Sequence, residues 1–484
     1  MKFTKKINLL IITSLLLQSN INLAKNINSQ YCLSFIGAAN AGNLEYIKIA
    51  LNNPQIDVNY QCGGVDGRND VGDTALMKAA RRGHVDIVKL LLNAGADPNI
   101  VDKSQLNNCE LGYEFGESKW GYTALMHAIS ANNVYDCTGK NRIEIVKLLL
   151  EAGADPNIQT LNGDTPLIEA SQRKYMEEEI ISLLLSYKAD SNIKRNKRNL
   201  ITSRPQYDWT ALIYAANEGL TKVVSLLLKA GANPNIKDDD GVTALKRAAL
   251  KGYTEIVSLL LKAGANPNIK VKNGVTALID AAYNNHIDVV KELINTKRKF
   301  IFNFRKTNLN ATNRHGMTAL IWAADQGHVD VVKLLLDAGA DPHITEEKGL
   351  TALIIAADKS HTEIVRLLLD AGTDPNIKDK YDQTALTCAA YMGNAEVIKL
   401  LINAHSDLNA QTKKEGLTAL MNAADKGHVD VVKLLLDAGA DPHIKDNKSY
   451  TKVTALYYAE RSYNYRNREE IVQLIKNAQK NRFY

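Results

Sequence analysis

One short motif recurs along almost the whole chain and constrains its fold more than any other feature. Thr-Ala-Leu, or Thr-Pro-Leu once, begins at Thr74, Thr123, Thr165, Thr210, Thr243, Thr276, Thr318, Thr351, Thr384, Thr418 and Thr454. The shortest spacing, 33 residues, occurs four times, and residues 318–344 and 418–444 differ at only three positions. A period of this length is typical of proteins whose units stack on their neighbours, so we expect an array and not several globular domains.

Each unit has the pattern of two short helices followed by a projecting loop. In residues 74–99, the Thr74 hydroxyl can accept a hydrogen bond from a free backbone N–H at a helix start. Apolar residues then recur at helical spacing up to Gly83, and a second helix runs to Gly95, where a left-handed residue is favoured. The following Asp-Pro-Asn ends the helix. Two helices of this size cannot bury both apolar faces alone, so the units must stack.

This order of residues resembles the ankyrin repeat. The resemblance rests on a glycine, Thr-Pro-Leu or Thr-Ala-Leu, an Ala-Ala pair, Gly-His, a Val-x-x-Leu-Leu helix and Gly-Ala-Asp, found almost throughout residues 70–444. It implies an all-α ankyrin-repeat solenoid of about twelve helix-turn-helix units with projecting β-hairpin-like loops. The family's histidine after Thr-Pro-Leu is replaced in every unit, by Met77, Met126, Ile168, Ile213, Lys246, Ile279, Ile321, Ile354, Thr387, Met421 and Tyr457. We expect apolar packing to substitute for its hydrogen bonds.

The repeats and their interruptions predict the organisation of the chain. Residues 1–24 form a signal peptide, 31–60 a degenerate first repeat, 70–450 the main array and 451–484 a C-terminal capping repeat. Insertions fall at 101–121, 134–142, 194–205 and 297–306. Lys188, Lys297 and His405 stand where glycine ends other second helices, and a non-glycine residue in a left-handed conformation costs on the order of 1 kcal/mol. We expect the stack to be weakest or bent in the repeats near residues 165–207 and 276–317.

The N-terminus predicts export. Lys2, Lys5 and Lys6 precede an apolar run at residues 7–17, which has the length of a signal peptide and is too short to span a bilayer as a helix. Cleavage after Ala24 is the best candidate, although Asn22 fits poorly two positions earlier. We expect a secreted or periplasmic protein without a transmembrane span. The alternatives are that these residues form a first core helix or a re-entrant anchor, and that the protein is cytoplasmic.

Five cysteines in so long a chain exclude a disulfide scaffold. In an oxidising compartment Cys32 with Cys62, or Cys109 with Cys137, can pair, whereas Cys388 lies in an alanine-rich helix and is expected to be a small core residue.

The sequence contains no recognisable catalytic or cofactor-binding motif. A phosphate-binding glycine loop, H-E-x-x-H, G-x-S-x-G and paired C-x-x-C are all absent. Histidines recur at equivalent repeat positions, which favours structural roles over metal ligation. Five begin the second helix and two lie in the loop after it: His84, His286, His328, His361 and His428, then His343 and His443. We therefore expect a non-enzyme that needs neither cofactor nor metal.

A protein partner is the function that the resemblance implies, bound on a concave surface of loop tips and first helices. Aromatic and arginine residues are the usual anchors of such interfaces. The candidates are Arg81, Arg82, Trp120, Tyr122, Tyr207, Trp209, Tyr283, Tyr381 and Tyr391. Trp120, Tyr122, Tyr207 and Trp209 are alternatively residues that pack under the adjacent insertions.

Two insertions are rich in basic residues. They carry Lys194, Arg195, Lys197 and Arg198, then Lys297, Arg298, Lys299, Arg305 and Lys306 interleaved with phenylalanines. This composition suits nucleic acid, an anionic membrane surface or an acidic protein, or the phenylalanines cover a hydrophobic edge. Because Lys and Arg (59) exceed Asp and Glu (53) only slightly, strong nucleic-acid binding is not indicated. The leading hypothesis is a non-catalytic scaffold for protein–protein interaction, with an oligomeric state that the sequence leaves open. The chain is similar to exported ankyrin proteins of intracellular bacteria, which act on host proteins.

Overall fold

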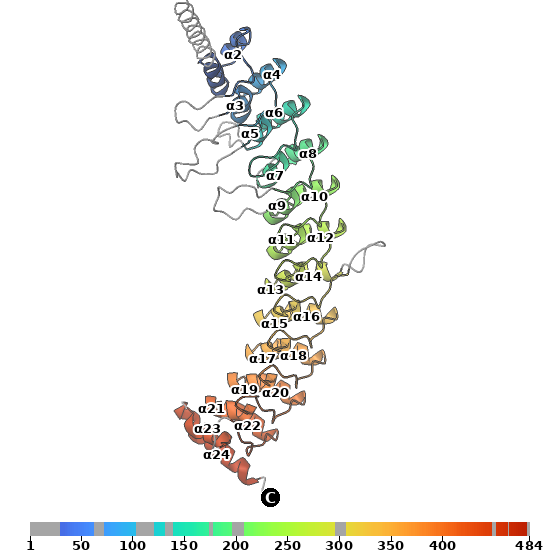
Figure 1. Ribbon diagram of the computed structural model, residues 1–484. Coiled ribbons are helices and arrows are strands. Elements are labelled where there is room, and N and C mark those ends of the chain that lie inside the picture. The colour runs from blue at the N-terminus through green and yellow to red at the C-terminus, as the bar shows by residue number, and fades with distance from the viewer. Residues whose placement is uncertain are drawn as a thin grey trace, which may run out of the picture. The chain divides into compact units, whose positions relative to one another are not determined.

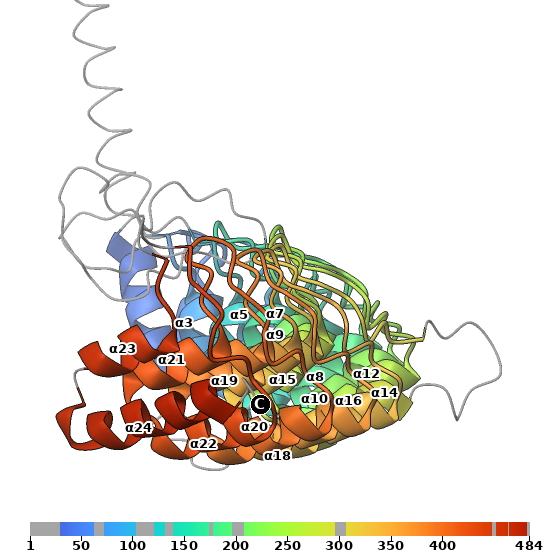
Figure 2. The same ribbon diagram turned by 90° about the horizontal axis from the view of Figure 1, so that it is seen from below.

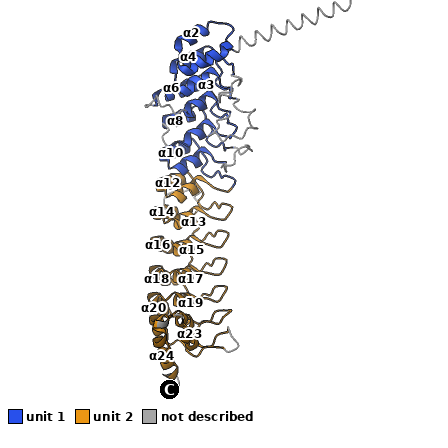
Figure 3. Cartoon of the chain, turned by 90° about the vertical axis from the view of Figure 1, so that its left-hand side faces the viewer, with its two compact units in different colours: residues 1–239 blue, residues 240–484 orange. Residues whose placement is uncertain are grey.

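A computed structural model describes residues 30–61, 72–102, 121–130, 139–173, 178–195, 208–295, 306–447, 452–462 and 464–481. These residues are helical or lie in turns and loops, and no strand occurs among them. The chain divides into two compact units, residues 1–239 and 240–484 (Figure 3). Nothing in the repeat pattern marks this division, since residues 70–450 were expected to form one array.

Each unit is a row of helix pairs (Figure 1). After a helical segment at residues 30–41, the first unit contains α2 (Leu44–Ala50), α3 (Ala75–Arg82), α4 (Val85–Asn93), α5 (Ala124–Ser130), α6 (Lys140–Glu151), α7 (Pro166–Ser171), α8 (Glu178–Ser186), α9 (Ala211–Glu218) and α10 (Thr221–Lys229). The second unit contains α11 (Ala244–Lys251), α12 (Thr254–Lys262), α13 (Ala277–Tyr283), α14 (Ile287–Ile294), α15 (Ala319–Gln326), α16 (Val329–Asp337), α17 (Ala352–Asp358), α18 (Thr362–Asp370), α19 (Ala385–Met392), α20 (Ala395–Asn403), α21 (Ala419–Lys426), α22 (Val429–Asp437), α23 (Ala455–Arg461) and α24 (Tyr465–Asn481).

The helices of each unit form two layers. First helices contact the first helices of neighbouring repeats, as in α13, α15 and α17, and second helices contact second helices, as in α14, α16 and α18. Within each unit the loops lie along one side of the first helices and the second helices lie along the other (Figure 2). The expected all-α repeat solenoid is confirmed, and its projecting loops are hydrogen-bonded turns.

Local sequence explains where the helices begin and end. Thr318 caps α15, because its hydroxyl accepts a hydrogen bond from the N–H of Ile321 at 3.1 Å. Such a cap stabilises a helix by about 1 kcal/mol. The helix ends at Gly327, whose φ of 78° is left-handed. The first unit shows the expected buried face as well, with Leu76, Ile87 and other apolar residues almost completely removed from water.

A histidine joins each of several repeats to the one before it. The Nε2 of His286 donates to the carbonyl of Leu250 at 3.0 Å, and its ring lies against Gly252, where an added Cβ would be 2.7 Å from Nδ1. The five histidines that begin second helices bond preceding-repeat carbonyls in this way: His84 to Asn40, His286 to Leu250, His328 to Tyr283, His361 to Asp325 and His428 to Tyr391. Their predicted structural role is confirmed.

The loop after each second helix makes another link. The side-chain oxygen of Asn310 accepts from the backbone N–H of Asp341 in the next repeat at 2.9 Å. In the repeat that carries His343 instead of asparagine, the N–H of Asp374 donates to His343 Nε2 at 3.4 Å. His343 therefore replaces an asparagine oxygen with a ring nitrogen in a longer and weaker bond.

Two of the three glycine replacements adopt the left-handed conformation that their positions require. Lys188 has φ of 64° and His405 has φ of 59°. Lys297, the signal segment at residues 1–24 and most of the predicted insertions lie outside the described residues. In the 134–142 insertion, residues 140–142 form the first turn of α6. The predicted capping repeat contains α23 and the 17-residue α24.

Candidate interaction surface

The first helices present two rows of side chains to the same side, which we call the first-helix face. They are the residues four and seven positions after each repeated threonine, and residues three apart are neighbours on a helix. In the second unit the four-position row reads Arg247, Asp280, Trp322, Ile355, Cys388, Asn422 and Tyr458, and the seven-position row reads Leu250, Tyr283, Asp325, Asp358, Tyr391, Asp425 and Arg461. These positions vary between repeats in charge and size, and Ile355, Cys388 and Asn422 of the four-position row are buried.

Two exposed tyrosines lie on this face. Tyr283 is 44% exposed and meets the ring of Trp322 edge to face, with centroids 5.0 Å apart. Tyr391 is 49% exposed, and the ammonium of Lys426 lies 4.4 Å from its ring centroid. Tyr381, in a loop, is 57% exposed. All three were predicted partner-binding residues, and each keeps about half of its surface open to water.

Tyr122 and Trp209 correct the prediction of exposed aromatic anchors. They are only 6% and 5% exposed. The Tyr122 hydroxyl donates to Glu169 at 3.1 Å, and Trp209 Nε1 donates to Asp238 at 2.9 Å. Both residues directly precede a repeated threonine, a position at which other repeats carry buried or half-buried side chains. They stabilise the stack and are not available to a partner, while Trp120 and Tyr207 lie outside the described residues.

Arg81 and Arg82 differ in their surroundings. Arg81 donates to Asp73 Oδ2 at 3.3 Å and is partly buried. Arg82 is exposed, and its Nε donates to Asn40 Oδ1 at 3.0 Å. Arg82 is therefore the more accessible of these two predicted anchors.

The described part of the basic segments is paired with acidic residues. Lys194 lies 2.6 Å from Asp208, and Arg195 lies 2.8 Å from Asp164 and donates to the Tyr214 hydroxyl at 3.1 Å. Both cations were predicted as members of a basic insertion, and the acids that pair with them come from neighbouring segments of the stack. Lys306 is exposed, and its carbonyl accepts from Asn268. The other predicted basic residues lie outside the described residues: Lys197, Arg198, Lys297, Arg298, Lys299 and Arg305.

A buried cluster of ionisable residues in the first unit escaped sequence reasoning. His127 Nε2 lies 3.2 Å from Asp102 and 3.6 Å from Asp73, and Lys78 lies 2.7 Å from Asp73. The only signal was that Lys78 and His127 occupy the same position, four residues after their threonines, between buried neighbours.

Among the described residues, Asp73, Asp102 and His127 form the group whose ligand atoms lie close enough together to hold a metal ion. The ammonium of Lys78 and the guanidinium of Arg81 already balance the two carboxylates, so a divalent cation would add uncompensated buried charge. We interpret the cluster as an ion-pair network between repeats.

Burial also raises the pKa values of two neighbouring groups in the first unit. It raises the pKa of Asp164 to about 6, against the opposing effect of Arg195. Burial likewise raises the pKa of the Tyr122 hydroxyl, and the nearby Glu169 carboxylate adds to the shift. Both side chains are buried.

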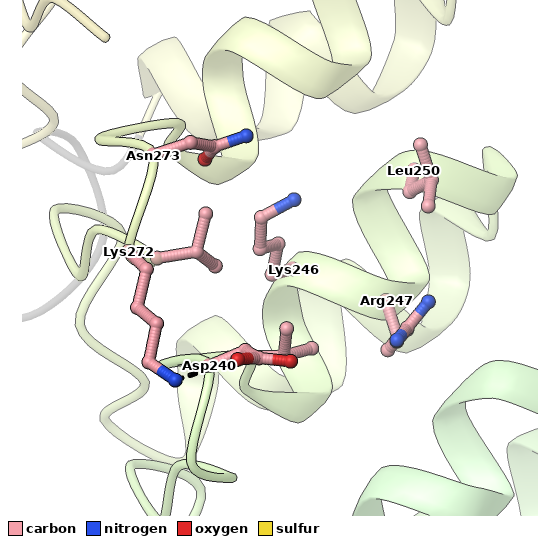
Figure 4. A pocket seen from close by; sticks show the side chains of 8 residues that line it. Asp240, Lys246, Arg247, Leu250, Lys272 and Asn273 are labelled. Atoms are coloured by element: carbon pink, nitrogen blue, oxygen red, sulfur yellow. Dashed lines mark hydrogen bonds and ion pairs between the residues drawn. The ribbon is translucent and has the colours of Figure 1, made fainter. Parts of the chain in front are cut away.

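A hollow lies on the loop side of α11 in the second unit (Figure 4). Its volume is about 320 Å³, and it is open to solvent. Its lining contains Asp240, Val242, Lys246, Arg247, Leu250, Val271, Lys272 and Asn273. Sequence reasoning did not find this hollow. Its signal is Lys246, the lone cation in the series of eleven residues that replace the family's histidine.

Comparison with known families identifies the repeats. The model for ankyrin repeats in three copies matches residues 5–102, 103–195, 134–238, 195–271, 245–346, 338–412 and 396–483. The chain belongs to the ankyrin-repeat family. Ankyrin repeats mediate contacts between proteins, so a protein-interaction scaffold is the general function that the family indicates. No helix among the described residues combines the length and the apolar character needed to cross a membrane.

Relatives of this ankyrin-repeat chain are diverse. It is 31% identical over 180 residues to ankyrin repeat and KH domain-containing protein mask-1 of Caenorhabditis elegans, covering 36% of this chain and 6% of the relative. It is 29% identical over 178 residues to ankyrin repeat and SOCS box protein 3 of Bos taurus, with coverage of 34% and 31%. Against the 2-5A-dependent ribonuclease of Mus musculus it is 37% identical over 98 residues, with coverage of 20% and 10%. The chain thus matches less than a third of each relative's length.

Proposed function

We propose that this ankyrin-repeat protein is a non-catalytic scaffold that binds a protein partner through the first-helix face and loop tips of its second unit. The observation that carries the proposal is the exposure of Tyr283, Tyr381 and Tyr391, each about half open to water. Tyrosine is enriched among the residues that contribute most to protein interfaces, because one end is apolar and the other forms hydrogen bonds. The repeat-to-repeat variation of this face suits a specific partner.

The proposal includes export by a bacterium and a partner that belongs to a host. Its support is the run of Lys2, Lys5 and Lys6 before the apolar residues 7–17, together with the resemblance to exported ankyrin proteins of intracellular bacteria. Mass spectrometry of the N-terminus of the protein recovered outside the producing cell tests this part. A chain that lacks residues 1–24 is expected, and an intact chain found only in the cytoplasm would contradict export.

Affinity capture with the full chain tests the scaffold itself. Host proteins bound by the immobilised wild-type chain are compared with those bound by Tyr283→Ala and Tyr391→Ala. Loss of a hot-spot tyrosine is expected to weaken binding by about tenfold or more. Tyr46→Ala is the matched control, because Tyr46 is similarly exposed but lies on a second helix, α2. Capture that is the same for all three variants would overturn the assignment of this face.

Binding of nucleic acid or of an anionic membrane is the alternative for the basic segments. The pairing of Lys194 and Arg195 with Asp208 and Asp164 gives it no support from the described residues. The same chain titrated with RNA, DNA and acidic vesicles at increasing salt discriminates between the two functions. Tight, salt-sensitive binding to these probes, without a captured protein, would favour the alternative.

A further inference from the structure

We propose that the hollow beside α11 binds a carboxylate side chain, glutamate or aspartate, from the protein partner. This inference rests on the proposed scaffold function and names the chemistry that one of its sites recognises.

Hydrogen-bond donors converge on this hollow. Lys246 extends into it from α11, and Asn273 extends toward the same space from the loop of the next repeat (Figure 4). The Asn273 side-chain oxygen accepts from the N–H of Val275, so its amino group is the end that offers donors. Arg247 and Lys272 also line the hollow. Val242, Val271 and Leu250 supply apolar surface, which suits the aliphatic part of an acidic side chain.

Lys246 is exceptional among the repeats. Equivalent residues such as Met77, Ile279 and Ile354 are buried and apolar. An apolar residue would therefore serve packing at this position better, since a lysine there must be desolvated. The Lys246 ammonium pairs with Asp280 of the next repeat, and an ammonium has three donors. Burial raises the pKa of the Asp280 carboxyl, and the neighbouring Lys246 ammonium opposes that rise.

The balance of charge favours a single negative charge in the ligand. Lys246, Arg247 and Lys272 carry three positive charges, and Asp240 with Asp280 carries two negative ones. The net charge of these side chains is therefore +1, which one carboxylate neutralises. A phosphate dianion would meet repulsion from Asp240, whose carboxylate also lines the hollow.

The entrance of the hollow can open at little cost. Lys272 lies 2.9 Å from Asp240, and both side chains are well exposed. Exposed ion pairs of this kind contribute only about 0–1 kcal/mol. An incoming carboxylate can therefore share or take the Lys272 ammonium without disrupting the stack, while Lys246 and Asn273 offer donors deeper in the hollow.

A peptide titration with the full chain tests the proposal. The probes are three fluorescein-labelled peptides of one length and sequence that carry glutamate, glutamine or phosphoserine at the same positions, and anisotropy reports binding. The glutamate peptide is expected to bind best. Lys272→Gln, a change of an exposed side chain, is expected to weaken its binding by about tenfold, which corresponds to about 1.4 kcal/mol.

Two further variants separate a specific site from general charge. The double variant Lys246→Thr with Asp280→Asn leaves the net charge unchanged and copies the residues of a natural pair in this chain, Thr387 and Asn422, in which the Asn422 amide donates to the Thr387 carbonyl. It is also expected to weaken binding about tenfold. Lys380→Gln is the matched control, because the N–H of Lys380 bonds the Lys348 carbonyl just as the N–H of Lys272 bonds the Asp240 carbonyl. It should leave binding unchanged.

Several outcomes would overturn the inference. Equal binding of the glutamate and glutamine peptides, or equal losses in the Lys272 and Lys380 variants, would show that the hollow does not recognise carboxylates. Preference for phosphoserine by tenfold or more would assign it to a phosphorylated partner instead. If the glutamate peptide fails to bind while tyrosine-dependent capture persists, the inference fails and the scaffold function stands. Loss of both would overturn both.

Discussion

Replacement of Gly393 by alanine tests how strongly neighbouring repeats depend on each other. Gly393 ends α19 with φ of 79°, and an added Cβ would be 2.5 Å from Nδ1 of His428 in the next repeat. The ring must therefore move away, and the 3.1 Å bond from His428 Nε2 to the Tyr391 carbonyl must break. The left-handed conformation costs alanine about 1 kcal/mol, and the lost bond and packing add about 1–2 kcal/mol. We expect a total of about 2–3 kcal/mol.

Gly339 supplies the matched control for this substitution. Its φ is 87°, and an added Cβ would find no atom within 4 Å. Gly339→Ala should therefore cost only the backbone term, about 1 kcal/mol. His428→Ala completes the test, because Gly393→Ala should cost about 1–2 kcal/mol less when the ring is already absent, and a double-mutant cycle measures that coupling.

Native-state hydrogen exchange of the full chain, read by mass spectrometry, is the appropriate assay because it reports stability for each helix. For Gly393→Ala, protection should fall mainly in α19, α20, α21 and α22, since the helices of neighbouring repeats pack on one another. Equal effects of Gly393→Ala and Gly339→Ala would refute the role of the ring contact. A uniform loss of protection in all helices would refute the nearest-neighbour reasoning itself.

Three other predictions concern single side chains. Burial raises the pKa of the Cys388 thiol to about 12. Iodoacetamide at pH 8 should therefore label Cys388 about a thousandfold more slowly in the native chain than in urea. Rapid labelling of the native chain, measured by peptide mapping, would contradict this. His343→Asn restores the asparagine of other repeats, and it should raise local stability by up to about 1 kcal/mol and so slow hydrogen exchange of the Asp374 amide. Unchanged exchange would contradict the hydrogen bond from Asp374 to residue 343. Burial raises the pKa of Asp164 from 3.8 to about 6, so the native state binds this proton more tightly than the unfolded state does. Local stability should fall by up to about 3 kcal/mol as the pH rises from about 4 to 6, Asp164→Asn should remove this slope, and a slope that persists would contradict the assignment.

The fold could be predicted from the sequence because the same local signals for helix start, helix end and buried face recur in each repeat. A threonine cap, small residues at helical spacing, a glycine terminator and a second apolar helix occur together at one period, and the structure uses each as expected. The division into two units between Asp239 and Asp240 was not predictable in this way.

The surface was harder to predict, because residue type alone does not reveal burial. Tyr122 and Trp209 were predicted to bind a partner because they are aromatic. Each directly precedes a repeated threonine, however, at a position that faces the interior. Tyr283 and Tyr391 follow their threonines by seven residues, at a position that faces solvent. Position within the repeat therefore distinguishes the buried pair from the exposed pair, whereas aromatic character does not.

An array of repeats thus provides its own reference for judging an unusual residue. At the position of Lys246 most other repeats show what packing alone requires, namely a buried apolar side chain such as Ile279 or Met421. A residue that departs from this requirement lowers the stability of the stack unless another interaction offsets the cost. Asp280 offsets part of it by pairing with the Lys246 ammonium, but the remaining donors lie beside an open hollow with further cations. Packing accounts for the residues that recur, and the exceptions among them are the places where binding is most reasonably sought.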